Sequence, residues 1–163
     1  MSRSTHQKRA VAAFAVAALI LTVPALAAGG TARSHRMQGS FTATNFSGPG
    51  CSSPLDLCAN GEFRGTLNGP VTAVATSLAP TSQPGIFVGV ADLVVHDRRG
   101  DVSCTETFIV NATPGSDGEE ALLCTVTGGT GRWTGVSGYI IGYGISPPGE
   151  TTTGQYSGKL TLR

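Results

Sequence analysis

Two acidic side chains, Asp92 and Glu106, have the residue type and spacing for acid–base chemistry. They flank Arg98-Arg99-Gly100, a segment that suits a three-residue hairpin loop whose glycine takes the left-handed conformation. This loop sets Asp97 opposite Asp101, and it therefore sets Asp92 opposite Glu106 on a mostly apolar face. Two neighbouring, poorly solvated carboxyls cannot easily both ionise, so one should hold its proton and serve as general acid or base. The competing interpretation is that this face is partly open to water, or that a one-residue bulge turns one carboxylate outward, because the pairing depends on register alone.

Aromatic side chains are the second candidate group, for binding rather than catalysis. Phe108, Tyr139, Tyr143 and Tyr156 are expected to line a cavity that takes a small apolar molecule. A metal site is not predicted, because the chain has no C-x-x-C and His96 is the one histidine in the body of the domain. No serine nucleophile motif precedes a suitable base, and no cofactor is predicted.

The four cysteines, Cys51, Cys58, Cys104 and Cys124, form an even set that predicts two disulfides in an oxidising compartment. Four cysteines allow three connectivities, and free thiols are the alternative. Proximity in sequence favours Cys51–Cys58 and Cys104–Cys124. In the chain-entropy description these bridges would contribute about 2.5 and about 3.3 kcal/mol.

The N-terminal segment predicts export. Arg3, Lys8 and Arg9 precede an apolar run from Val11 to Ala28, which contains the cleavage pattern Ala25-Leu26-Ala27. Residues 1–27 are therefore predicted to be a secretory signal peptide, and the protein to be secreted and to meet a membrane only during export. An uncleaved anchor is the alternative, although Pro24 interrupts the run.

Charge argues against a nucleic-acid partner. Removing the basic leader leaves eight Lys and Arg against ten Asp and Glu, a formal charge of −2 on residues 29–163. Phosphate binding needs a surplus of basic side chains on one face, and here they are scattered among acids.

The rest of the chain is divided into short runs rich in β-branched and aromatic residues, separated by Gly, Pro, Asn and Asp. No helical period intervenes, so the fold class is all-β. The expected strands are Met37–Phe46, Gly61–Leu67, Val71–Leu78, Gly85–His96, Asp101–Ala112, Glu120–Thr127, Val136–Ile145 and Thr152–Leu162. Residues 37–163 are predicted to form a single closed antiparallel barrel of about eight strands, after a flexible mature N-terminus at 28–36. Val90, Val94, Phe108, Leu122 and Val126 are expected to face inward. A two-sheet sandwich is the alternative.

A glycine-rich run, Gly128-Gly129-Thr130-Gly131-Arg132-Trp133-Thr134-Gly135, lies between the sixth and seventh expected strands. It lacks the Gly-Lys-Ser/Thr end of a phosphate loop; its glycines permit a tight turn and Trp133 can plug a barrel end. With the aliphatic strand that follows, the run resembles the GGTGxFxGAxG segment of the allene oxide cyclase and dirigent-like barrel superfamily, and Gly154-Gln155-Tyr156-Ser157-Gly158 fits its closing strand. The resemblance implies an eight-stranded barrel with an apolar cavity, often trimeric.

Three functions follow from these patterns. The first is a secreted barrel that binds a small apolar molecule. The second is an isomerase or cyclase that uses Asp92 and Glu106. The third is a structural or interaction protein whose barrel is filled by its own side chains, because a fold does not by itself imply a function.

Overall fold

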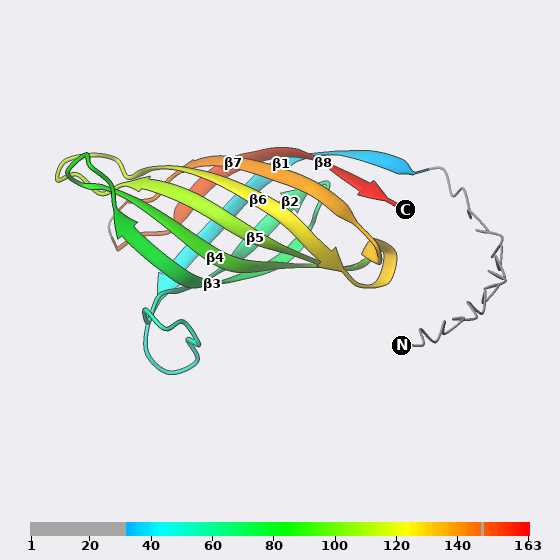
Figure 1. Cartoon of the computed structure of the whole chain (residues 1–163), viewed down its shortest axis with the longest axis horizontal. Helices are drawn as coiled ribbons and strands as arrows, with labels where there is room; N and C mark the ends of the chain where they lie inside the picture. The colour runs from blue at the N-terminus through cyan, green and yellow to red at the C-terminus, as the bar shows by residue number, and fades with distance from the viewer. Residues whose placement is uncertain (1–31, 148) are drawn as a thin grey trace, which may run out of the picture.

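The computed structural model describes residues 32–147 and 149–163, which form one closed antiparallel barrel (Figure 1). Each strand pairs with the next along the chain, and the first pairs with the last, so no strand edge is left free. The all-β class and barrel closure are thus confirmed, and the sandwich alternative is wrong. The strands are β1 (Arg33–Phe46), β2 (Cys58–Gly65), β3 (Gly69–Pro80), β4 (Ile86–Asp97), β5 (Gly100–Asn111), β6 (Glu119–Gly129), β7 (Ser137–Ile145) and β8 (Thr152–Leu162), with a 3-10 turn, η1 (Gly131–Trp133), between β6 and β7.

The first strand begins earlier than the sequence predicts. β1 starts at Arg33, inside the 28–36 segment that was expected to be flexible, because β8 extends far enough to pair Leu162 with Arg33. Residues 33–36 therefore belong to the barrel, which begins four residues earlier than predicted. The predicted signal peptide, residues 1–27, lies outside the described part of the chain.

The β4–β5 hairpin has a shorter turn than predicted. Asp97 pairs with Gly100 across a two-residue turn, so the register differs by one residue from the expected one. The Asp97 carboxylate accepts hydrogen bonds from the backbone N–H of Arg99 at 2.9 Å and from its guanidinium, which holds the turn tight. A one-residue change moves every side chain of β4 to the opposite face.

That change corrects the predicted interior. On β4 the odd-numbered residues Ala91, Leu93 and Val95 are buried, whereas Val90 and Val94 are only half-buried on the outer face. On β5 and β6 the even-numbered residues do face inward as predicted, with Leu122 and Val126 buried and Phe108 half-buried.

Both predicted disulfides are present, Cys51–Cys58 and Cys104–Cys124. The second lies in the barrel interior and joins β5 to β6 diagonally, because Cys124 is opposite Glu106 while Cys104 is opposite Val126. The predicted face is right, but the β5–β6 register differs by two residues from the expected one. A bulge beside Ser103 also changes the register toward the Gly-rich end of β6.

One end of the barrel is filled by side chains. Trp133 from η1 is 1% exposed and packs in the core with Met37, Leu67 and Leu160. Outside it, the guanidinium groups of Arg99 and Arg132 lie 5.2 and 5.8 Å from its ring centre. The Gly-rich run therefore closes this end, as its sequence predicts.

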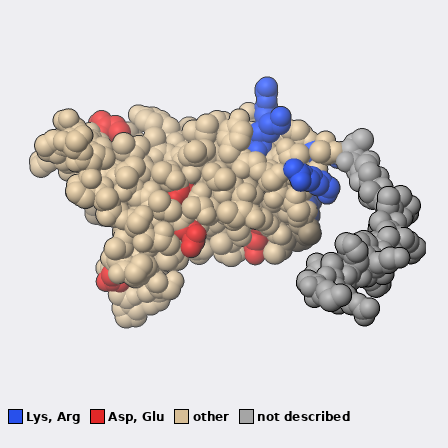
Figure 2. Space-filling view, in the orientation of Figure 1, with Lys and Arg blue, Asp and Glu red and all other residues tan. Residues whose placement is uncertain are grey.

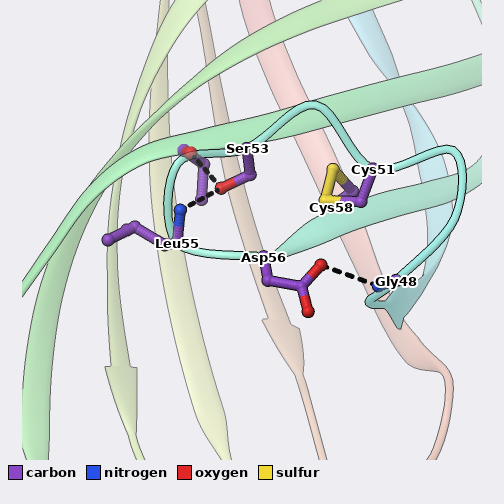
Figure 3. Close-up of a disulfide and its surroundings, with 7 residues drawn as sticks. Gly48, Cys51, Ser53, Leu55, Asp56 and Cys58 are labelled. Atoms are coloured by element: carbon purple, nitrogen blue, oxygen red, sulfur yellow. Dashed lines mark hydrogen bonds between the residues drawn. A yellow bond between two sulfur atoms is a disulfide. The ribbon is translucent and has the colours of Figure 1, made fainter.

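The opposite end is bordered by four loops, of which the longest connects β1 to β2. Figure 3 shows this loop, crossed by the Cys51–Cys58 disulfide and by a 2.7 Å hydrogen bond from the Gly48 N–H to the Asp56 carboxylate. The Ser53 hydroxyl also donates to the Ala75 carbonyl of β3 at 2.6 Å. These contacts fix the loop to the rim of the barrel.

No helix among residues 32–147 and 149–163 is long and apolar enough to cross a membrane.

Candidate functional site

A cavity of about 160 Å³ lies inside the barrel, on the side away from Trp133. Its walls are mostly apolar and come from all strands but β7, and three of its lining residues are the phenylalanines Phe41, Phe63 and Phe108. Leu78, which is 40% exposed, also lines it, so the cavity reaches the surface at the rim. We refer to this end of the barrel as the mouth.

The packing of an aromatic ring against a glycine shapes one wall. Gly89 of β4 lies opposite Phe108 of β5, and a Cβ atom built at Gly89 would overlap the Phe108 ring. The glycine therefore allows the ring to lie back against the strand. Any larger residue at position 89 would push the ring toward the cavity.

The polar centre of the cavity is Glu106, midway along β5. Its side chain lines the cavity and the residue is 6% exposed, opposite Ala91 on β4 and Cys124 on β6. Burial raises the pKa of Glu106 to about 7, and the nearby charge of Glu120 adds to the effect. The group therefore changes its charge near neutral pH.

Glu120 of β6 is the second acid of the cavity and lies nearer the mouth, opposite Val110. Burial raises the pKa of Glu120 as well, while a hydrogen bond with the Ser146 hydroxyl opposes that effect. Ser146 in turn accepts a 2.7 Å hydrogen bond from the Thr152 hydroxyl. A short chain of hydroxyls thus holds the carboxyl nearer the mouth in place.

The predicted pairing of Asp92 with Glu106 is wrong. Asp92 is exposed on the outer face of β4, in register with Thr105. The two-residue turn at Arg98-Arg99 turns Asp92 outward, and the acid that accompanies Glu106 is Glu120. The β6 strand carries Glu120 on the same even-numbered face as Leu122 and Cys124, a parity that the sequence already contains.

The four aromatic residues predicted to line the cavity lie in three different places: on the cavity wall, on the outer face and in the core below the cavity. Phe108 lines the cavity, as expected. Tyr139 and Tyr143 are 45% and 60% exposed on the outer face of β7, so neither lines the interior. Tyr156 is buried beneath Phe63, with ring centres 4.7 Å apart, and its hydroxyl donates to the Leu67 carbonyl. It supports the floor of the cavity rather than lining it.

Phe41 and Phe63 were not among the predicted site residues. Both lie in predicted strands, and their ring centres are 5.9 Å apart in a stacked arrangement at the base of the cavity. Alternation on β1 puts Phe41 on the same side as Met37, but it cannot reveal whether an inward ring fills space or borders it.

Comparison of the chain with models of protein families, with curated proteins and with solved structures found no match. The interpretation of this site therefore depends on its geometry.

That geometry supports binding of a small molecule with an apolar body and one polar group. The volume is close to that of an engineered apolar cavity of about 150 Å³ that takes up benzene. Within the described residues no group of three or more His, Cys, Asp or Glu side chains is arranged to hold a metal ion.

Proposed function

We propose that this protein binds a small, mainly apolar molecule inside its barrel. The observation that supports this proposal is the cavity of about 160 Å³, which reaches the surface at the mouth and is lined largely by apolar side chains. Ligand sites in proteins combine such walls with a few polar groups that orient the ligand. The two glutamates would supply those groups here.

Calorimetry with benzyl alcohol, an uncharged ligand of suitable size, tests this function. Saturable binding with a negative heat-capacity change is expected, since apolar surface leaves water. Ala91→Leu should abolish binding by filling the cavity next to Glu106, because Ala91 is 3% exposed and lines the wall. Ala121→Leu is the matched control, since Ala121 is exposed on the outer face and its substitution should leave binding unchanged. Absence of saturable binding by the unmodified protein would refute the proposal.

A second candidate function is acid catalysis, as in an isomerase or cyclase. The observation that favours it is the pKa of about 7 of Glu106, which leaves a proton available for transfer near neutral pH. The pair concerned would be Glu106 with Glu120, not Asp92. A substrate turnover that is lost in Glu106→Gln while binding remains would favour this candidate.

We also propose that the protein is secreted and that it belongs to the superfamily that its sequence resembles. The two disulfides indicate an oxidising environment, which agrees with the predicted signal peptide at 1–27. The barrel architecture and the plug formed by Trp133 agree with the resemblance to the allene oxide cyclase and dirigent-like superfamily. N-terminal sequencing of the secreted protein should place the start of the mature chain near Ala28.

The proposed partner of the outer surface is further copies of the chain, in the trimer that this resemblance implies. Large apolar side chains are exposed on adjacent strands β4 to β7, a surface that favours association. These residues are Val88, Ile109, Leu123, Tyr139, Ile141 and Tyr143. Light scattering should report three chains per particle, and Ile141→Lys should give one chain; a particle of one chain before substitution would contradict the trimer.

A further inference from the structure

The Glu106 carboxyl has no hydrogen-bond partner among the described residues, although it is more than nine-tenths buried. It borders the cavity, between Ala91 of β4 and Cys124 of β6, and the rest of the lining is mostly apolar, with the neutral amides of Asn45 and Asn60 among its polar members. A buried carboxyl without a partner is costly, so such a group in a folded protein marks a place for a further molecule. The cavity in front of Glu106 is where that molecule would lie.

The cavity contains negative charge and no positive charge. Glu106 from β5 and Glu120 from β6 are the charged side chains of its lining, and the lining residues of β1, β2, β3, β4 and β8 are uncharged. Thr152 and Ser146 contribute neutral hydroxyls. Asp92 and Glu119, the nearest acids along the flanking strands, are exposed on the outer face. No described residue therefore neutralises Glu106 when it ionises.

Charged side chains on the outer surface are also distributed unevenly between the two ends of the barrel. Figure 2 shows Lys and Arg gathered at the end of the barrel where β1 begins and β8 ends, which is the Trp133 end. The four loops at the mouth, between β1 and β2, β3 and β4, β5 and β6, and β7 and β8, contain no Lys or Arg but do contain Asp56, Asp117 and Glu150. A low-dielectric cavity with acids at its entrance concentrates cations from solution.

The aromatic walls suit a cation as well. Phe41, Phe63 and Phe108 all line the cavity, and the faces of such rings attract an ammonium group. An uncharged ligand would gain from the apolar surface and could hydrogen-bond to Glu106, but it would leave the negative charge of the ionised carboxyl without a counter-charge. A carboxylate ligand would be repelled by both acids.

We propose, building on the proposed binding function, that the cavity selects small organic ammonium ions, with the ammonium group on Glu106 and the apolar body among the phenylalanine rings. One primary or secondary amine of about the size of benzylamine fits the volume of about 160 Å³. Glu120 adds a second negative charge nearer the mouth, held by its contact with Ser146.

Ammonium binding is expected to be coupled to pH. The ion pairs with the ionised form of Glu106, whose pKa of about 7 means that a proton must be released for binding below neutral pH. For a single such group, affinity should fall about thirtyfold between pH 8 and pH 5.5. Protonation of Glu120, which shares the cavity, acts in the same direction.

The experiment compares three probes of similar size by calorimetry at pH 8: benzylamine, which is cationic, benzyl alcohol, which is neutral, and benzoate, which is anionic. We expect benzylamine to bind at least tenfold more tightly than benzyl alcohol, and benzoate not to bind. At pH 5.5 the affinity for benzylamine should be about thirtyfold lower, whereas that for benzyl alcohol should not fall.

Variants then assign the preference to particular residues. Glu106→Gln should remove the preference for benzylamine over benzyl alcohol, and with it the pH dependence of that preference. Glu120→Gln should reduce the preference in part. Glu119→Gln is the matched control: Glu119 precedes Glu120 on β6 but is exposed and bonded to the Asn111 amide at 2.9 Å, so its substitution should change neither.

The outcomes distinguish this inference from the function on which it depends. If benzyl alcohol and benzylamine bind equally, or if the preference survives in Glu106→Gln, the cavity binds apolar molecules and the ammonium proposal is overturned. If none of the three probes binds, the proposed binding function fails with it.

Discussion

Replacing Glu106 by glutamine should make the protein more stable at alkaline pH, because it replaces a buried ionisable group by a neutral polar one. The folded-state pKa of Glu106 is about 7, whereas the ordinary glutamate value is 4.5. An acid whose folded pKa is raised binds more protons in the folded state than in the unfolded state, so stability is highest below pH 4.5 and falls as pH rises toward and through 7. A shift of this size corresponds to about 3 kcal/mol.

Most of this loss, roughly 2 to 3 kcal/mol, should occur between pH 5 and pH 8. Glutamine has nearly the same shape and does not ionise, so the variant should lack this part of the pH dependence. Urea unfolding followed by fluorescence would measure it, because the chain contains a single tryptophan and Trp133 is 1% exposed in the folded state. The unfolding free energy of the variant minus that of the unmodified protein should rise by roughly 2 to 3 kcal/mol across this range.

Two further variants sharpen the measurement. Asp92→Asn should leave the pH dependence unchanged, since Asp92 is exposed on the outer face. Glu120→Gln should move the steep part to lower pH without removing it, because burial, not the charge of Glu120, is the larger cause of the raised pKa of Glu106. Parallel pH profiles for the unmodified protein and Glu106→Gln would show that this reasoning is wrong.

Three other perturbations have defined outcomes. Asp97→Asn should lower the unfolding free energy by about 2 kcal/mol at pH 7. Desolvation raises the pKa of Asp97, but hydrogen bonds from Arg99 and from backbone N–H groups lower it to about 2, so this stability is present above pH 4 and is lost as pH falls through 2. Equal unfolding free energies of the variant and the unmodified protein at pH 7 would contradict this. Gly89→Ala should push Phe108 into the cavity and weaken benzyl alcohol binding in calorimetry, and undiminished affinity would contradict the described wall. Replacing Cys51 and Cys58 together by serine should lower the unfolding free energy by about 2 kcal/mol, and no loss would show that the loop is ordered without its bridge.

The strand pattern could be predicted from the sequence because runs of β-branched and aromatic residues coincide with the strands, although glycines such as Gly89 and Gly142 also lie inside strands. Thr152–Leu162 is both the predicted eighth strand and the observed β8, and Ile145 ends β7 as expected. The disulfide pairing also follows from proximity in sequence. The count of eight strands favoured a closed barrel, but the same count also allowed a two-sheet sandwich, which only the pairing of β1 with β8 rules out.

The residues of the candidate site were harder to predict than the strands, because the side of the sheet on which Asp92 lies depends on the length of the turn between β4 and β5. A side chain in that turn, the Asp97 carboxylate, binds Arg99 and shortens the loop by one residue, and no periodicity in the strands records such a contact. Glu106 was identified correctly as an inward acid, since Cys104 and Cys124 place the even face of β5 inside. The cavity itself depends on how the inward side chains fill the barrel, and the alternation of inward and outward residues along each strand does not predict how much space they leave empty.

The closure between β1 and β8 has a consequence for how the chain reaches its folded state. Arg33 lies opposite Leu162, so the first and last strands of the barrel are neighbours, and the eleven residues of β8 supply the partner of β1. Until β8 is available, β1 and β7 each present an unpaired edge, a surface prone to aggregation. A protein cut short before Thr152 would keep both edges permanently, because the ring of strands closes only when β8 is present. Conversely, joining the two ends and opening the exposed turn at Gly115 should give a circularly permuted chain with the same ring of strands.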